Sequence, residues 1–145
     1  DVRNDTFLFE KEAVMKIIVP SAGPAVDQRT VGYVINIAKR LNAQLVVVRV
    51  LTEKEKEAEG EQSLSLFVEH GKRENVPVNI ILRHGDIAPV VIEIAQEKSV
   101  DLIILGVSHG EIVAEWMNAG AIERTDIPVL LIPKWVPAAD RSSSN

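Results

Sequence analysis

The chain has 145 residues, a formal net charge of −5 and no cysteine. This length suffices for one domain with its own core, and the lack of cysteine excludes disulfides, thiolate metal sites and a cysteine nucleophile. The acidic charge and an aromatic content of only 4% argue against a nucleic-acid-binding surface. No apolar run approaches the length that crosses a bilayer, and cysteine-free chains suit a reducing compartment, so we expect a cytoplasmic protein.

The first third of the chain alternates between strand and helix patterns. Residues 1–14 are mixed and charged around Phe7-Leu8-Phe9, and we interpret them as an arm or linker. Met15–Pro20 is a short β-branched run closed by proline, which is typical of a buried strand. Val26–Leu41 repeats apolar residues at helical spacing, and the almost wholly apolar Ala43–Leu51 predicts a strand covered on both faces. The expected helix face consists of Val31, Val34, Ile35, Ala38 and Leu41.

A glutamate-rich stretch, Thr52–Gln62, comes next. Its glutamates repeat at i,i+4 spacing and it contains Gly60, and both features disfavour a helix. We therefore predict a mobile loop that adds little stability, with a helix starting near Gln62. That helix should bury Leu64, Phe67 and Val68, expose His70, and be closed by Gly71 and Asn75-Val76-Pro77.

Three further strand patterns follow. Val78–Arg83 predicts the third strand, and Asp86 is placed to cap the next helix, with Pro89 in its first turn. The inner face of that helix should hold Ile87, Val90, Val91, Ile94 and Ala95. Asp101–Gly106 predicts the fourth strand and Pro128–Pro133 the fifth. Residues 134–145 are polar and serine-rich, and we expect a frayed tail.

Regular alternation of apolar strands and amphipathic helices predicts an α/β fold, a five-stranded, mostly parallel sheet with helices on both faces. In such sheets ligands bind at the carboxyl ends of the strands, where the strand order reverses. The first and fourth strands are each followed by a glycine-bearing loop, so we expect them to flank that crevice.

Three segments follow one family pattern. They are Ile17–Pro20 with the helix and strand ending Ala38–Val50, then Gly85–Ala88 leading to Val100–Gly106, and finally Ile127–Pro133. The second is the most specific, because a Gly-Asp helix start is correctly spaced to an Asp-Leu-Ile-Ile-Leu-Gly strand. Together they resemble the universal stress protein family over 15–133. The resemblance implies a Rossmann-like fold of strand order 3-2-1-4-5, a role in stress or regulation, and dimers that often pair through the last strand.

Many members of that family bind ATP, and the resemblance implies where the nucleotide would lie. In Pro20-Ser21-Ala22 the family has an aspartate at the last position, where it meets the nucleoside, and Ala22 offers no carboxylate. Val50 matches the position against adenine. The corresponding loop runs from Gly106 through Val107, Ser108 and His109 to Gly110. We interpret the glycines as turn residues rather than an anion cradle, and leave open whether Ser108 and His109 contact a ligand.

The phosphate loop can be aligned in two ways. Alignment on Gly110 and Gly120 puts Val107 at the first glycine and Ala121 at the hydroxyl residue. Alignment back from Ile127 gives a helix of ordinary length over 112–124 and a loop about five residues short, which loops tolerate. We prefer the second alignment. Either way the phosphate site is damaged.

We therefore expect a regulatory or binding domain with no catalytic residues, no metal site, no cofactor and weak or absent ATP binding. The alternatives are a stress protein that binds ATP or an AMP-type nucleotide, and a cytoplasmic regulatory domain cut from a membrane transporter. A receiver domain would need acids where Ser21-Ala22 and Arg83-His84 stand. His84 and Asp86 are too few for a metal site.

The last strand carries a prediction about assembly. Val129, Leu130, Leu131 and Ile132 are apolar on both faces, yet they end the sheet in the implied order. Exposed apolar edge strands pair readily with another chain. We therefore predict a homodimer joined symmetrically through this strand.

Overall fold

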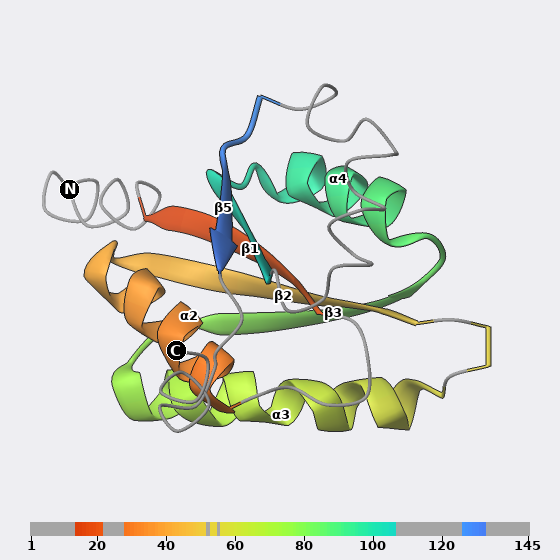
Figure 1. Ribbon diagram of the computed structural model, residues 1–145, viewed down its shortest axis with the longest axis horizontal. Helices are drawn as coiled ribbons and strands as arrows, with labels where there is room; N and C mark the ends of the chain where they lie inside the picture. The colour runs from red at the N-terminus through yellow and green to blue at the C-terminus, as the bar shows by residue number, and fades with distance from the viewer. Residues whose placement is uncertain (1–13, 22–27, 52, 55, 107–125, 133–145) are drawn as a thin grey trace, which may run out of the picture.

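A computed structural model describes residues 14–21, 28–51, 53, 54, 56–106 and 126–132. Within these residues the strands are β1 (Met15–Ser21), β2 (Ala43–Leu51), β3 (Val78–His84), β4 (Leu102–Gly106) and β5 (Val129–Ile132). The helices are α2 (Gln28–Arg40), α3 (Glu57–Glu74) and α4 (Ile87–Lys98) (Figure 1). The expected arm, the tail, the helix over 112–124 and the stretch 107–110 lie outside the described residues. None of the described helices has both the length and the hydropathy to cross a membrane.

The sheet has five strands in the order β3-β2-β1-β4-β5, and every pair is parallel. This confirms the predicted fold and strand order. β1 pairs along its whole length with β2, from Met15 opposite Ala43 to Ser21 opposite Arg49. From β1, the next two strands along the chain, β2 and β3, add to one side of the sheet. β4 and β5 then add to the other side of β1, so the strand order reverses between β1 and β4.

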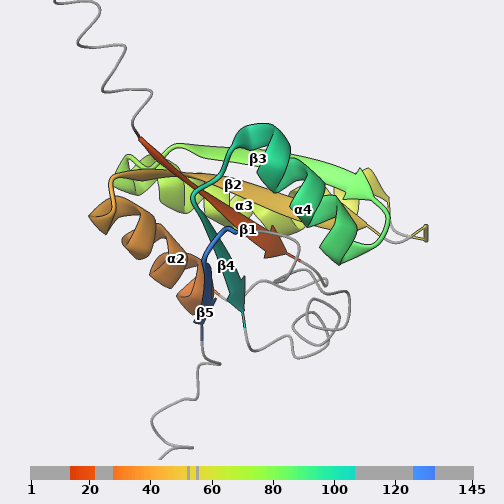
Figure 2. The ribbon, with the colours of Figure 1, turned by 90° about the horizontal axis from the view of Figure 1, so that it is seen from above.

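The two faces of the sheet are covered by different helices, as Figures 1 and 2 show. Alternate strand residues point to opposite faces. One set, including Ile18, Val48 and Leu105, packs with α4. The other, including Ile17, Val47 and Ile104, packs with α2 and α3. Burial on both faces explains why the strands read as nearly unbroken apolar runs.

α2 buries four of the five residues that we predicted for its inner face, namely Val31, Val34, Ile35 and Ala38. The fifth, Leu41, is 43% exposed. The helix ends at Arg40, and Asn42 follows in the left-handed conformation with φ 52°. This reversal turns the chain into β2 and leaves Leu41 outside the core, so our prediction for Leu41 was wrong.

α3 begins at Glu57, five residues before the predicted start, so the predicted loop does not extend to Gln62. A carboxylate at a helix N-terminus gains about 0.3–1 kcal/mol from the helix dipole, whereas a like-charge i,i+4 pair costs only about 0.2–0.5 kcal/mol. Leu64 and Phe67, both buried, anchor the helix further along. Tertiary packing therefore extends the helix into a sequence that disfavours it locally.

We had predicted that Gly71 helps to end α3. It lies instead buried within the last turns of the helix. A Cβ at this position would lie 2.5 Å from Val78 Cγ2 and 2.7 Å from the carbonyl oxygen of Val76. The glycine therefore lets the start of β3 pack directly on the helix. The reversal itself falls at Asn75, which has φ 58°.

α4 follows the sequence prediction closely. Asp86 is its N-cap residue with extended torsions, although its side chain makes no capping hydrogen bond. Ile87, Val91, Ile94 and Ala95 are buried, and Val90 is partly buried against the same core. The helix places these side chains under the sheet face formed by β1 and β2.

Candidate functional site

The carboxyl edge of the sheet opens between β1 and β4. The two strands pair at Ile17 opposite Leu102 and at Ile18 opposite Ile103. β1 continues to Ser21 against β2, and β4 continues to Gly106 against β5, with Gly106 opposite Ile132. In Figure 2 the arrows of β1 and β4 diverge toward their carboxyl ends. The parting coincides with the reversal of strand order, the position at which open α/β sheets bind ligands.

The predicted site residues that the structure describes lie along this edge. Pro20 and Ser21 end β1 and are buried, and Gly106 ends β4 and is half-buried. Val50 lies at the end of β2, but its side chain packs into the core under α4. The other predicted positions, Ala22 and 107–110, lie outside the described residues.

Arg49 is a residue of this edge that our sequence reasoning missed. It is only 2% exposed, and it stands opposite Ser21 in β1. Its Nη1 donates a hydrogen bond of 2.8 Å to the carbonyl oxygen of Val50. Burying a guanidinium is costly unless the surroundings compensate it, and this hydrogen bond is part of that compensation. The available signal was a single charged residue inside a strand expected to be covered on both faces.

The end of β3 adds a polar turn. His84 stands opposite Leu51, and the N–H of Gly85 donates to the Leu51 carbonyl at 3.4 Å. Gly85 has φ 138°, a backbone conformation that favours glycine. His84 and Asp86 are both exposed. Over the described ranges, no group of three or more His, Asp or Glu side chains is placed to hold a metal ion.

The opposite, amino edge of the sheet carries hollows that the sequence did not predict. One, of about 310 Å³, lies between α2 and α3 and is lined by Gly32, Ile35, Asn36, Lys39, His70, Arg73 and Glu74. His70, which we expected to be exposed, is half-buried and faces Gly32, where a Cβ would lie 3.8 Å from its ring. Lys39 Nζ donates to Glu74 Oε2 at 3.0 Å, and this hydrogen bond and the charge of Lys39 lower the pKa of Glu74.

β5 forms one lateral edge of the sheet and presents apolar side chains. Leu130 is 38% exposed and Leu131 is 50% exposed, whereas Ile132 is buried. Leu131 and Leu130 alternate along the strand, so both of its faces carry exposed apolar surface.

Comparison with known proteins bears on both the fold and the family. A universal stress protein from Archaeoglobus fulgidus in complex with dAMP is 20% identical, with a TM-score of 0.66 over 81% of this chain and 97% of that one. A universal stress protein in complex with cAMP is 20% identical, with a TM-score of 0.65 over 85% and 99%. A family member from Arabidopsis thaliana with AMP bound is 14% identical, with a TM-score of 0.65 over 87% and 94%.

At these identities the structural likeness establishes the fold alone. No protein in the search of curated sequences matches this chain. The model of the universal stress protein family, however, matches residues 14–133, which is most of the chain and includes all the described strands and helices. The chain therefore belongs to the universal stress protein family.

Proposed function

We propose that this protein is a non-catalytic regulatory domain that binds an adenine mononucleotide at the carboxyl edge between β1 and β4 and binds ATP weakly. The observation that carries the proposal is the parting of β1 and β4 beyond Ile18 and Ile103, at the point where the strand order reverses. Three proteins of the same fold hold dAMP, cAMP and AMP. Each of these ligands carries a single phosphate.

The charge of the edge supports a small anionic ligand. Arg49 puts a buried guanidinium next to the end of β1, and a charge in a low-dielectric interior acts more strongly than one in water. Ala22 supplies no carboxylate, so this position offers neither repulsion to a phosphate nor an acceptor for ribose hydroxyls. A ligand that gains more from its phosphate than from its ribose fits this combination.

ATP should bind weakly for three reasons, of which the first applies to AMP as well. A ribose hydroxyl buried without its acceptor at Ala22 costs about 1–3 kcal/mol, and every 1.4 kcal/mol is about tenfold in affinity. Val107 occupies the place of a phosphate-loop glycine on one alignment, and a β-branched residue resists the torsions that glycine adopts there. The acidic chain also repels a polyanion more than a monoanion, although salt screens this effect.

The non-catalytic part of the proposal rests on the sequence of the same edge. Hydrolysis of ATP would need an activated water or nucleophile and a held triphosphate. The acid at position 22 is missing, and the phosphate loop is altered on either alignment. Binding without turnover suits a domain that reports a nucleotide level to a partner.

We also propose that the domain acts as a homodimer joined through β5. Leu130 and Leu131 would be covered by the same residues of a second copy in a symmetric contact. Pairing through this strand would also remove one exposed edge of the sheet.

Isothermal titration with AMP, cAMP, adenosine and Mg-ATP tests the ligand. We expect AMP to bind at least about tenfold more tightly than Mg-ATP. Ala22→Asp should tighten adenosine binding by restoring the hydroxyl acceptor, and Ala22→Asn is the matched control without the charge. A dissociation constant for Mg-ATP below about 10 μM would contradict the predicted ATP weakness, and absence of binding by all four compounds at millimolar concentration would reject the site.

A further inference from the structure

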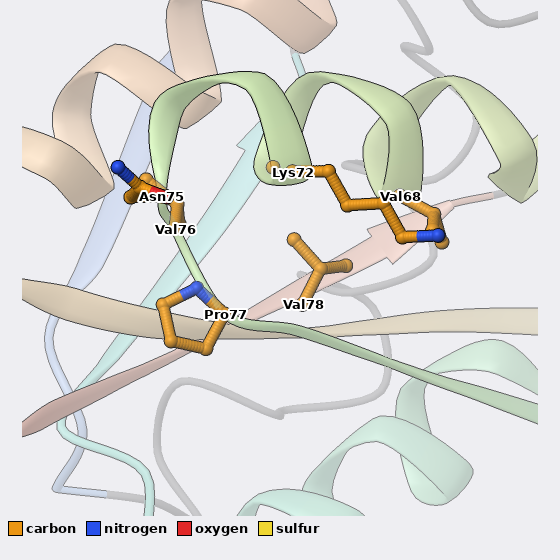
Figure 3. A pocket seen from close by; sticks show the side chains of 7 residues that line it. Val68, Lys72, Asn75, Val76, Pro77 and Val78 are labelled. Atoms are coloured by element: carbon orange, nitrogen blue, oxygen red, sulfur yellow. The ribbon is translucent and has the colours of Figure 1, made fainter.

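An open hollow lies between α3 and the start of β3, on the sheet face away from α4 (Figure 3). It encloses about 440 Å³ and is lined by Val68, Gly71, Lys72, Asn75, Val76, Pro77 and Val78. Val78 points from β3 toward the helix, and Lys72 extends along the side of the hollow (Figure 3). The lining is mostly apolar with one lysine, and we call it the β3 groove.

The β3 groove belongs to an apolar surface that is left uncovered. β3 is the edge strand on this side of the sheet, and Ile80, two residues beyond Val78 on the same face, is 41% exposed. Val68 and Val78 are only partly buried. An apolar groove beside an edge strand invites a partner segment.

The chain itself enters next to this groove. A second hollow, of about 450 Å³, shares Asn75, Val76 and Pro77 with the β3 groove and is also lined by Val14, the first described residue. Lys39 and Arg73 line this second hollow too. Val14 therefore lines a hollow that adjoins the β3 groove.

The composition of that preceding segment matches the groove. Phe7-Leu8-Phe9 is its apolar cluster, and it is followed by Glu10, Lys11 and Glu12, a stretch with one net negative charge. Phe9 is five residues from Val14, a reach of about 17 Å when extended. This apolar cluster and its weakly acidic flank would meet an apolar groove that carries Lys72, next to a second hollow that carries Lys39, Arg73 and Glu74.

The geometry points to an intramolecular contact in which Phe7-Leu8-Phe9 docks into the β3 groove of its own molecule, with Glu10 and Glu12 beside Lys72 and Arg73. A segment tethered at Val14 has an effective concentration in the millimolar range, which a separate molecule reaches only when concentrated. The docked arm would cover Val68, Val78 and the adjoining edge of β3. It would thereby block the pairing of that edge with another chain.

The absence of native cysteine allows a direct test by disulfide trapping in the full chain. The test pair is Leu8→Cys with Lys72→Cys, which puts one thiol in the arm and one at the groove. The control pair is Leu8→Cys with Gln96→Cys. Gln96 is exposed near the end of α4, on the opposite face of the sheet. It is also near the start of β1, because Lys16 Nζ donates to the Lys98 carbonyl at 3.2 Å.

A freely moving arm could bring the thiol at position 8 to either target thiol. A faster reaction with the thiol at position 72 would therefore indicate docking in the β3 groove. We expect the test pair to form an intramolecular disulfide at least about tenfold faster than the control pair under mild oxidation. Adding Phe7→Ser and Phe9→Ser to the test pair should reduce its rate to that of the control. These two substitutions lie in the arm and leave the groove intact.

Equal rates for the two pairs would overturn the proposal, as would a test-pair rate that is unaffected by the serine substitutions. A disulfide that joins two molecules, seen as a dimer on a non-reducing gel and accelerated at higher protein concentration, would also overturn it. That result would assign the groove to the arm of a second copy. The test does not depend on the nucleotide, because no ligand is present in the assay.

Discussion

Replacing Gly71 by alanine should destabilise the protein, although alanine is the better helix residue. Glycine inside a helix is about 0.5–1 kcal/mol worse than alanine. Here, however, the new Cβ would lie 2.5 Å from Val78 Cγ2 and 2.7 Å from the Val76 carbonyl oxygen. The Val76 segment cannot easily move away, because the N–H of Val76 donates to the Gly71 carbonyl at 2.9 Å. Overpacking of this kind costs about 1–3 kcal/mol, so after the helix gain we expect a net loss of about 1 kcal/mol, and at most about 2.5 kcal/mol.

Gly32→Ala is the matched control. Gly32 is also a glycine within a helix, and it is half-buried beside another helix. A Cβ at Gly32 would meet only the His70 ring, at 3.8 Å, which is an ordinary contact distance. Alanine should therefore keep its helix advantage there and stabilise the protein by about 0.5–1 kcal/mol. The two substitutions are chemically identical, and the reasoning predicts opposite signs.

Urea denaturation followed by circular dichroism measures both free energies of unfolding, and thermal melts should agree, since 1 kcal/mol moves the midpoint by about 3 °C at this size. An unchanged or more stable Gly71→Ala protein would refute the packing of β3 on α3. A common sign for the two variants would show that helix propensity, rather than the neighbouring atoms, decides the outcome.

Two further predictions concern assembly and pH. The double variant Leu130→Lys with Leu131→Lys should convert the proposed dimer to a monomer. Light scattering at roughly tens of micromolar protein measures this, because the dimer fraction depends on concentration. A dimer that survives both changes would reject β5 as the interface. The lowered pKa of Glu74, caused first by its hydrogen bond from Lys39, adds stability above the ordinary carboxyl value of 4.5 that is lost as the pH falls through the lowered value. Lys39→Met should reduce this dependence, with a remainder from the charges of Arg73 and His70. Because the pair is exposed, the effect should be small and should weaken further in high salt. An equal acid sensitivity in the variant would count against the pair.

The sequence predicted those parts of the fold in which one physical effect dominates. β2 runs from Ala43 to Leu51 as expected, because a strand buried on both faces needs an unbroken apolar run. The start of α3 was missed because Leu64 and Phe67 hold the helix from a distance, which local charge rules do not include. Gly71 was taken for a helix end because its reason for being glycine is contact with Val78, a neighbour known only from the fold.

The reversal of strand order at the candidate site was predictable, whereas the side chains around it were not. Alternation of strands and helices is enough to place a crevice beside β1 and β4, since the strand order fixes where the sheet divides. The side-chain direction of Val50 was not predictable from the family position, because a strand residue faces the core or the opposite layer according to register. The hollows at the amino edge were missed because they form where α3 packs on α2 and on the start of β3, which the sequence alone does not show.

The charge of the carboxyl edge bears on the ligand that we propose for it. The family aspartate is replaced by Ala22, while Arg49 stands buried in the next strand, opposite Ser21. Losing a negative charge and holding a positive one act in the same direction, since both make the edge more favourable for an anion. On the proposed function, a phosphate bound at this edge would be attracted by the charge of Arg49, so we expect a mononucleotide to bind more tightly than adenosine.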